Sequence, residues 1–358
     1  MEKTLNLIIN LVKKGKLKEA LKYLDQLLQI YPENTKLLDL NGVIFLEMSR
    51  FSEALHVYKK ITRMEPLNTD YKNNLAVSYF GLAEERRKDF DFAKAISYYT
   101  EAVLADKLMT SAHKNLGLLL KHTGDTKGAI SSLQKALDLD PSNESTQHCL
   151  NALLGNKTSK APKKHVSDAF DQYAEKFDNH LIKDLDYKIP DILRRLIDKV
   201  DDRHLLQNAV DLGCGTGISG SAFSDKVKYF EGIDVSKKML QIAERKNIYD
   251  KLAIEDIETY LQSSIIDYDL FIATDVFIYM GDLDETFRLV SEKSRKNAIF
   301  GFSTEHIGSN GFTLLPSARY GHSRKYIKSL VFKYNFDEIH FSIEPLRKER
   351  EKWIEGGV

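Results

Sequence analysis

The chain has 358 residues, more than a typical single domain, so its length predicts two domains. Hydrophobic residues make up 42% and charged residues 29%, as in soluble globular proteins. The formal net charge is zero, and residues 167–358 carry 27 Lys and Arg against 33 Asp and Glu, which argues against a nucleic-acid partner.

The cysteines and the first residues exclude further classes. Two cysteines, Cys149 and Cys214, cannot form a disulfide framework, and neither lies in a metal-ligand cluster, so we expect no metal. Residues 1–16 contain an apolar stretch of only about eight residues, too short to cross a membrane. We therefore expect a cytoplasmic protein with no membrane partner.

The first half of the chain repeats itself. Ala20 and Ala54 are 34 residues apart, as are Pro32 and Pro66. Small residues would let paired helices approach closely, and each proline would end the second helix of a pair. In the repeat over 69–109, extra residues in AEERRKDFDF predict a lengthened helix or a protruding hairpin. The period resembles that of tetratricopeptide repeats.

The resemblance sets the expected domain organisation. We assign residues 1–155 to a tetratricopeptide array of about four repeats plus a capping helix over 144–154. The lysine-rich residues 156–166 are the expected linker, and 167–358 form the second domain. Such arrays bind an extended peptide or another protein in a concave groove; the alternative, a scaffold that packs on its own catalytic domain, stays open.

The second domain opens with an aromatic stripe. Phe170, Tyr173 and Phe177 have helical spacing, which is typical of a helix packed on a core. A second helix is expected after Pro190.

The sequence NAVDLGCGTG at 208–217 predicts a buried strand that runs into a glycine-rich turn. The glycines would let a flat ligand lie against the main chain, and a helix from Ile218 would direct its free N–H groups toward it. The next strand, 229–233, ends in Asp234, whose carboxylate can accept hydrogen bonds from a ribose diol. This pattern predicts a nucleoside site.

Two nucleoside cofactors compete for this site. Gly215, Gly217 and Gly220 also satisfy the GxGxxG fingerprint of an NAD(P)-dependent oxidoreductase. Asp211, just before the glycines, would repel a diphosphate and attract the ammonium and sulfonium of S-adenosylmethionine. The oxidoreductase stays as the alternative enzyme, and a non-catalytic tetratricopeptide adaptor with a vestigial cofactor site as a third hypothesis.

The motifs DLGCGTG and GIDVSKKML resemble the first two motifs of class I S-adenosylmethionine-dependent methyltransferases. The resemblance implies a Rossmann-like domain with a mostly parallel seven-stranded sheet, and methyl transfer to an unidentified acceptor. It places the methionine moiety beside Asp211 and the glycines, and the ribose on Asp234. The residues implied to bind the cofactor in these two motifs are Asp211, Gly213, Cys214, Gly215, Gly217, Asp234 and Val235.

Further cofactor contacts are expected at the next two strands. A third strand in LAIED ends near Asp256, and the resemblance implies that Asp256 and Ile257 contact adenine. A fourth strand over 270–273 ends at Thr274 and Asp275. Ligands of open parallel sheets bind outside the carboxyl ends of the strands, so Asp275 is expected at the chemistry.

A lid is implied by the pattern FDxYAxxFDxHL over 170–181. It resembles the lid segment of bacterial-type predicted methyltransferases that contain tetratricopeptide repeats. By that resemblance, Tyr173, Phe177 and His180 would close over the cofactor.

The late part of the domain supplies the candidates for catalysis. Strands are expected over 296–305, 336–347 and 351–358, with a helix over 326–334. The segments STEH and LLPSARYGHSRKYI resemble a late substrate loop. Methyl transfer needs alignment and a deprotonated nucleophile. The candidates for these tasks are Glu305, His306, Tyr320 and His322, each with a structural hydrogen bond in a loop as the alternative.

Overall fold

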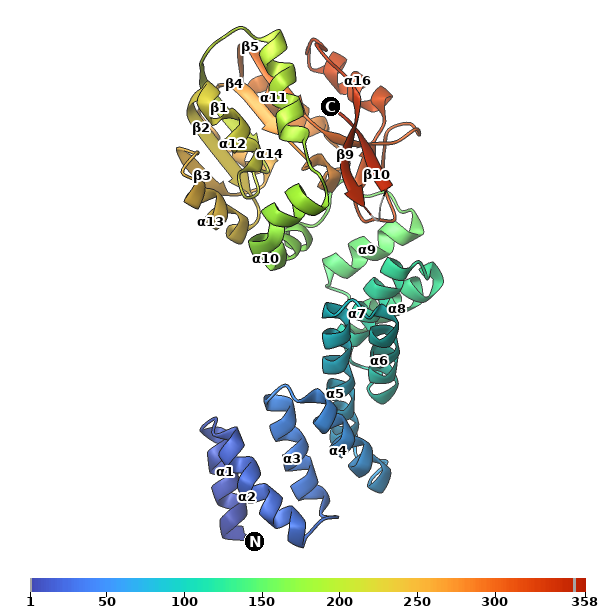
Figure 1. The fold of residues 1–358 in the computed structure, drawn as a ribbon. Helices are drawn as coiled ribbons and strands as arrows, with labels where there is room; N and C mark the ends of the chain where they lie inside the picture. The colour runs from blue at the N-terminus through green and yellow to red at the C-terminus, as the bar shows by residue number, and fades with distance from the viewer. Residues whose placement is uncertain (1, 350–351) are drawn as a thin grey trace. The chain divides into compact units, whose positions relative to one another are not determined.

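The structure is a computed structural model that describes residues 2–349 and 352–358. The chain divides into two compact units, Met1–Leu150 and Asn151–Val358, which are described separately (Figure 1). None of the described helices is long and apolar enough to span a membrane.

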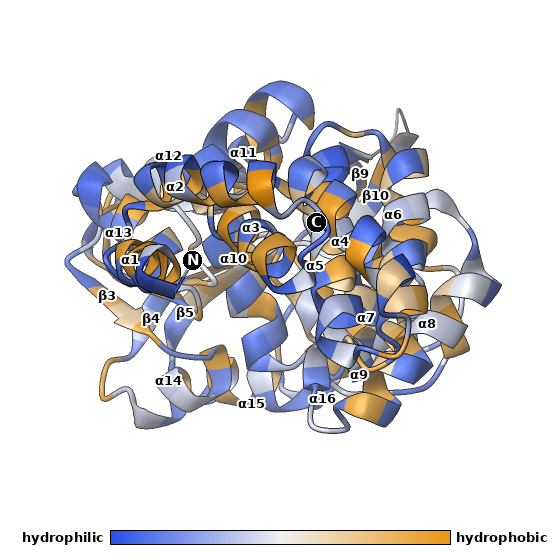
Figure 2. Ribbon diagram, turned by 90° about the horizontal axis from the view of Figure 1, so that it is seen from below, coloured by the Kyte–Doolittle hydropathy of each residue, from blue (hydrophilic) through white to orange (hydrophobic). Residues whose placement is uncertain are grey.

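The first unit is an array of helices in which each helix from α1 to α7 packs against the next one along the chain. The helices are α1 (Glu2–Lys13), α2 (Leu17–Ile30), α3 (Thr35–Glu47), α4 (Phe51–Met64), α5 (Thr69–Lys88), α6 (Phe92–Ala105), α7 (Thr110–Thr123), α8 (Thr126–Leu139) and α9 (Glu144–Leu154). Each helix buries one face, so the repeat helices in Figure 2 carry both hydrophobic and hydrophilic residues.

The repeat pattern has visible mechanical causes. A Cβ atom on Gly42 would lie 2.6 Å from the ring of Tyr58, so the absence of a side chain lets α3 and α4 approach closely. Asn34 and Asn68 cap α3 and α5, because their side chains accept hydrogen bonds from backbone N–H groups one turn later. The insertion lengthens α5 to 20 residues, the first of the two predicted outcomes.

The second unit is an α/β domain. Its helices are α10 (Lys163–Asn179), η1 (His180–Asp184), α11 (Ile189–Val200), α12 (Ile218–Phe223), η2 (Ser224–Lys226), α13 (Lys237–Lys246), α14 (Ile257–Ser263), η3 (Phe277–Tyr279), α15 (Asp284–Glu292) and α16 (Arg324–Lys333). Its strands are β1 (Leu206–Leu212), β2 (Val227–Asp234), β3 (Lys251–Ile254), β4 (Tyr268–Ala273), β5 (Ser294–Phe302), β6 (Thr304–His306), β7 (Phe312–Leu314), β8 (Tyr320–His322), β9 (Ile343–Glu349) and β10 (Lys352–Gly357).

A parallel sheet in the order β3-β2-β1-β4-β5 forms the centre of this unit. The alternating side chains of its strands pack on two cores, one beneath α11 and α12, the other beneath α14, α15 and α16. Crossover connections through helices keep the strands parallel, and the order reverses between β1 and β4.

The predicted seven-stranded sheet differs from the observed one. Five strands form the parallel sheet, while β9 and β10 pair antiparallel in a second sheet of order β7-β8-β6-β10-β9. The cause lies at Ser303, where β5 ends and the chain starts the short β6; β10 pairs with β6 instead of β5. Of the strand expected over 336–347, only residues 343–347 belong to β9, and residue 351 of the last expected strand lies outside the described residues.

The segment expected to be a linker belongs structurally to the second unit. The carbonyl oxygen of Ser159 accepts hydrogen bonds from the N–H groups of Gly281 (2.7 Å) and Asp282 (2.8 Å). Ala161 donates its N–H to the carbonyl oxygen of Tyr279 at 2.9 Å, and α10 already begins at Lys163. Residues 159–166 are therefore ordered against the domain that follows them.

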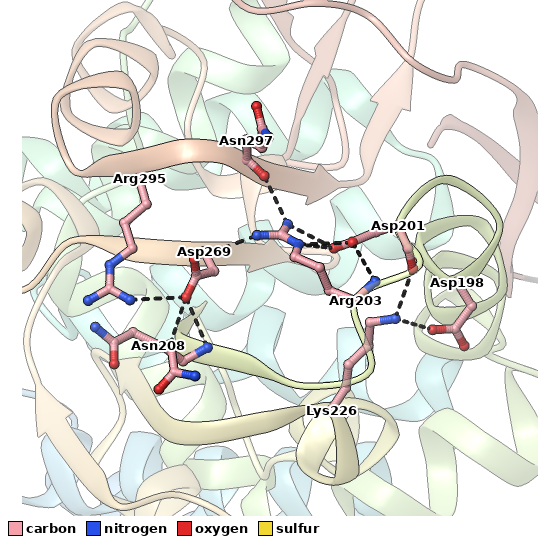
Figure 3. A network of polar contacts seen from close by, with 9 residues as sticks. Asp198, Asp201, Arg203, Asn208, Lys226, Asp269, Arg295 and Asn297 are labelled. Carbon is pink, nitrogen blue, oxygen red and sulfur yellow. Dashed lines mark hydrogen bonds and ion pairs between the residues drawn. The ribbon is translucent and has the colours of Figure 1, made fainter.

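Ion pairs hold the amino ends of the strands together (Figure 3). Asp269, at the start of β4, accepts hydrogen bonds from the backbone N–H groups of Gln207 (2.9 Å) and Asn208 (3.1 Å) on β1. Arg295 on β5 lies 3.3 Å from the same carboxylate, and Arg203 lies 3.6 Å from it. This edge of the sheet is opposite the one where parallel strands bind ligands.

Candidate active site

A cavity of about 480 Å³ opens at the carboxyl ends of the parallel strands. It is large enough for a nucleoside cofactor, since ligand cavities usually measure about 300–1,000 Å³. Most of the residues singled out in the sequence meet there. The predicted residues that line it are Tyr173, Phe177, His180, Gly213, Cys214, Gly215, Asp234, Val235, Asp256, Ile257, Thr274 and Asp275.

The glycine loop follows β1 and forms one wall. Gly213, Gly215 and Gly217 have φ angles of 74°, 54° and 84°, which side chains rarely adopt. A Cβ atom on Gly213 would also lie 2.3 Å from Val276, so the loop and the end of β4 are in close contact. Gly217 precedes α12 and does not line the cavity; its part in the site is to make the turn.

Asp234 ends β2 inside the cavity wall. One carboxylate oxygen accepts a hydrogen bond from the N–H of Gly215 (2.9 Å) and the other from the N–H of Ser236 (2.7 Å). Burial raises the pKa of Asp234 to about 6 against the lowering effect of these two hydrogen bonds. The carboxylate is thus oriented by the glycine loop.

Asp211 lies in β1 behind this wall. Its side chain is 1% exposed and does not line the cavity. One oxygen accepts a hydrogen bond from the Tyr249 hydroxyl at 2.7 Å, and the other has no partner among the described residues. Burial raises the pKa of Asp211 to about 7, and nearby Asp234 adds to the rise. Asp211 therefore lies in the layer behind the cavity lining, and its predicted contact with the cofactor stays a prediction.

Asp256 lies between the end of β3 and the start of α14, and Ile257 is the first residue of α14. Asp256 is the N-cap of α14, because its carboxylate accepts hydrogen bonds from the N–H (3.1 Å) and hydroxyl (2.8 Å) of Thr259. Burial raises the pKa of Asp256, but the hydrogen bonds from Thr259 and the charges of Lys163 and Lys160 together hold it below its ordinary value. The sequence analysis did not foresee this capping role.

Asp275 sits at the end of β4 in a left-handed backbone conformation, with φ of 56°. One of its oxygens lies 2.6 Å from Nη1 of Arg347, whose Nη2 lies 3.1 Å from Glu305. Arg347 is 1% exposed and lines the cavity. No motif in the sequence indicates Arg347, because it comes from β9, more than 70 residues beyond Asp275.

The segment predicted to be a lid, residues 170–181, forms the end of α10 and the start of the π-helical turn η1. The hydroxyl of Tyr173 hydrogen-bonds Nδ1 of His180. Asp171 accepts hydrogen bonds from the Ser236 hydroxyl (2.6 Å) and the N–H of Lys238 (3.1 Å), which fastens α10 to the start of α13. The segment is therefore attached to the start of α13, just after Asp234, a contact that the sequence analysis missed.

The three predicted catalytic residues do not reach the cavity. His306 ends β6, and the Tyr320 hydroxyl hydrogen-bonds Thr158 at 2.5 Å. His322 donates from Nε2 to the carbonyl oxygens of Met280 (2.9 Å) and Gly281 (3.0 Å), and burial lowers its pKa to about 4. Tyr320 and His322 thus make structural hydrogen bonds, which was the alternative to catalysis, and the catalytic role stays a prediction for all three residues.

Comparisons with known proteins bear on both units. Residues 210–300 match the family model of a methyltransferase domain, and residues 5–34 and 80–144 match models of tetratricopeptide repeats. Superkiller complex protein 3 of Homo sapiens is 27% identical over 128 residues, which cover 36% of this chain. The chain spans only 8% of the length of that relative.

Solved structures resemble one unit or the other. An S-adenosylmethionine-dependent methyltransferase from Clostridium acetobutylicum is 17% identical, with 53% of this chain and 97% of that chain covered and a TM-score of 0.39. The N-methyltransferase NodS from Bradyrhizobium japonicum with S-adenosyl-l-homocysteine is 12% identical, with 53% and 95% covered and a TM-score of 0.42. MamA from Desulfovibrio magneticus RS-1 is 22% identical, with 40% and 77% covered and a TM-score of 0.31.

These TM-scores are low, so the assignment rests on the family models. A methyltransferase domain agrees with the expected cofactor, S-adenosylmethionine, and with the expected α/β fold. The chain therefore combines tetratricopeptide repeats in its first unit with a methyltransferase domain in its second.

Proposed function

We propose that the second unit binds S-adenosylmethionine in the cavity and transfers its methyl group to an acceptor bound beside it. The observation that carries the proposal is Asp234, a carboxylate at the end of β2 that the glycine loop orients toward the cavity. It lies within the residues that match a methyltransferase domain. That match argues against the NAD(P)-dependent oxidoreductase.

The proposed contacts follow the order of the strands. Asp234 and Val235 would hold the ribose, Asp256 and Ile257 the adenine, and the loop from Gly213 to Gly215 the methionine moiety. The cofactor would supply an electrophilic methyl group. The lid would exclude water through Tyr173 and Phe177, whose rings meet edge to face at 5.7 Å beside the cavity.

The charge of the site favours a cationic cofactor. Asp211 and Asp234 are both buried enough to raise their pKa values, and among the described residues neither forms an ion pair with a Lys or Arg side chain. A sulfonium and an ammonium nearby would stabilise the ionised carboxylates, whereas a diphosphate would be repelled.

Calorimetric titration with S-adenosylmethionine, S-adenosylhomocysteine and NADH tests the cofactor. We expect the first two to bind and NADH not to. Asp234→Ala should weaken S-adenosylmethionine binding at least about tenfold, because a charge-assisted hydrogen bond to the ribose is lost. Asp202→Ala, an exposed carboxylate outside the cavity, is the matched control. An affinity for Asp234→Ala within about twofold of the parent would exclude the ribose assignment.

For the first unit we propose recruitment of a protein or peptide in the groove of residues 1–155, as part of a cytoplasmic enzyme. The repeat pattern supports this role, because stacked helix pairs expose an extended surface suited to protein binding. The hypothesis of a non-catalytic adaptor predicts a different result: the chain would bind the cofactor but would transfer no methyl group to any acceptor. Comparing proteins cross-linked to the full chain with those cross-linked to residues 156–358 tests the recruitment.

A further inference from the structure

The pattern FDxYAxxFDxHL contains two aspartates that have no part in the proposed cofactor contacts. The dipeptide Phe-Asp occurs twice in it, at 170–171 and again seven residues later at 177–178. Seven residues are about two turns of an α-helix, so Asp171 and Asp178 lie on the same face of α10. Neither aspartate lines the cavity, whereas Phe170, Tyr173 and Phe177 of the same helix do.

Asp171 contacts the segment that follows Asp234. It accepts hydrogen bonds from the Ser236 hydroxyl (2.6 Å) and the N–H of Lys238 (3.1 Å), and the bond from Ser236 holds the pKa of Asp171 below its ordinary value. Ser236 is fully buried, and its own N–H donates to one oxygen of Asp234 at 2.7 Å. Asp171 therefore holds one of the two segments that orient Asp234.

Asp178 contacts the other segment. One of its oxygens accepts a hydrogen bond from the Thr216 hydroxyl, and the other lies 2.8 Å from Nζ of Lys246. Thr216 is 1% exposed and directly follows Gly215, whose N–H donates to the second oxygen of Asp234 at 2.9 Å. Through these two aspartates, α10 is fastened to the glycine loop and to both ends of α13, which lies beside it (Figure 1).

Backbone hydrogen bonds fix the chain before and after this segment. The N–H of Ala161 donates to the carbonyl oxygen of Tyr279 at 2.9 Å, before α10 begins. The N–H of Lys348 donates to the carbonyl oxygen of Leu185 at 3.0 Å, just after η1 ends. Residues of α10 and η1 line the cavity together with the glycine loop and the ends of β2 and β4. A cofactor that fills the cavity would therefore contact α10, and movement of α10 away from the loop would open a path for it.

We propose that Asp171 and Asp178 are latches: they hold α10 against α13 and the glycine loop, and the cofactor enters and leaves when these contacts are open. This inference rests on the proposed function, because it assumes that S-adenosylmethionine occupies the cavity. The Asp178 contact is suited to repeated opening. The side chains of Lys246 and Asp178 are 27% and 34% exposed, so water can solvate both charges once they separate.

Surface plasmon resonance of the immobilised full chain with S-adenosylhomocysteine tests the latches. Asp171→Ala and Asp178→Ala should each raise the association and the dissociation rate constants about tenfold, because the lost charge-assisted hydrogen bonds increase the open fraction. The dissociation constant should stay within about threefold of the parent, since the contacts are lost from the free and the occupied chain alike. Alanine is the best helix former, so neither substitution disfavours α10.

Two further variants separate the latch from a general effect on the helix. Asp168→Ala is the matched control, since Asp168 lies on the same helix in an exposed ion pair with Lys164, and it should leave both rate constants unchanged. Lys246→Gln removes the partner of Asp178 from outside the cavity and should raise both rate constants about threefold. Added to Asp178→Ala, it should accelerate exchange no further, because both substitutions break the same contact. Lys246→Gln also provides the test if an alanine variant does not fold.

Unchanged rate constants in the variants of Asp171, Asp178 and Lys246 would overturn the inference. Faster dissociation with unchanged association would also overturn it, because the two aspartates would then only support the occupied site. Failure of the parent chain to bind S-adenosylhomocysteine contradicts the proposed function alone. Hydrogen exchange of residues 163–181 then tests the latches without a cofactor: faster exchange in Asp178→Ala than in Asp168→Ala supports them, and equal exchange rejects them.

Discussion

Asp269 and Asp211 are buried carboxylates at opposite ends of the parallel sheet, and they differ in the partners that surround them. At the amino ends, Asp269 is 8% exposed and accepts two backbone hydrogen bonds while Arg203 and Arg295 lie beside it. At the carboxyl ends, Asp211 is 1% exposed, and among the described residues one of its oxygens has no partner. Both ends carry buried charge; at the carboxyl ends Asp275 is paired with Arg347, but Asp211 has no cationic partner among the described residues.

The difference separates structural from functional charge. A buried carboxylate without a cation nearby destabilises its ionised form, and such groups are retained where a ligand compensates them. The pKa values follow this division. Hydrogen bonds from Arg203 outweigh burial and hold the pKa of Asp201 below normal at the amino end, while burial raises those of Asp211 and Asp234 at the other.

Removing the compensated carboxylate should have the largest effect on stability. Asp269→Ala leaves the N–H groups of Gln207 and Asn208 without their acceptor and two arginines without their counter-charge. We expect the free energy of unfolding to fall by about 3 kcal/mol. The loss is moderate because both arginines are partly exposed to solvent. Urea titration of the second unit's transition measures it. Asp267→Ala, an exposed neighbour, should change stability little.

A loss for Asp269→Ala no larger than that for Asp267→Ala would break the comparison, because the amino-end network would then contribute nothing. Cofactor affinity is the second measurement on this variant. It should stay unchanged at temperatures where the variant is folded, since the network lies at the far end of the strands from the cavity.

Asp211→Asn tests the uncompensated end, and here the effect depends on pH. The pKa of Asp211 is raised from 3.8 to about 7 in the folded chain. Because the folded chain holds this proton more tightly than the unfolded chain, protonated Asp211 stabilises the fold fully at pH values below the pKa of Asp211 in the unfolded chain. This stabilisation is lost as the pH rises through about 7. Between about pH 5 and pH 7 this loss is about 2 kcal/mol, at about 1.4 kcal/mol per pH unit.

The side chain of Asn cannot ionise, so in Asp211→Asn the free energy of unfolding should decrease less between about pH 5 and pH 7. The smaller decrease that remains comes from Asp234. Chemical unfolding without cofactor at about pH 5, 6 and 7 measures the slope. The same variant should bind S-adenosylmethionine more weakly, because the charge that attracts the cation is gone. An unchanged slope would mean that Asp211 is not the titrating group.

Much of this site could be predicted from sequence because its motifs are local. The glycine loop, Asp234 and Asp256 each follow directly from a strand end, and short-range patterns determine where strands end. The helix pairs of the first unit were predictable for the same reason, since a 34-residue period repeats the same contacts.

The features that were missed depend on contacts between distant segments. Arg347 meets Asp275 across 72 residues, and Lys160 approaches Met280 through an isolated β-bridge. His322 was predicted as a candidate for catalysis because a histidine in a polar loop can act as a base; the sequence did not indicate that it donates to two carbonyl oxygens. Sequence shows the residue type, whereas the partner across the fold decides its task.

Asp256 allows the smallest and most discriminating test, because it belongs to both categories of carboxylate. It caps α14 through Thr259, and it lines the cavity where adenine is proposed to bind. Asp256→Ala should lower the free energy of unfolding by about 1 kcal/mol, whereas Asp256→Asn should preserve it, since Asn and Asp cap helices about equally well.

Calorimetry with S-adenosylmethionine then decides whether Asp256 also contacts the cofactor. If the side chain contacts adenine, both variants should bind the cofactor more weakly by about threefold to tenfold. If only Asp256→Ala loses affinity, the residue serves the site by holding the start of α14 in place and belongs with the structural carboxylates.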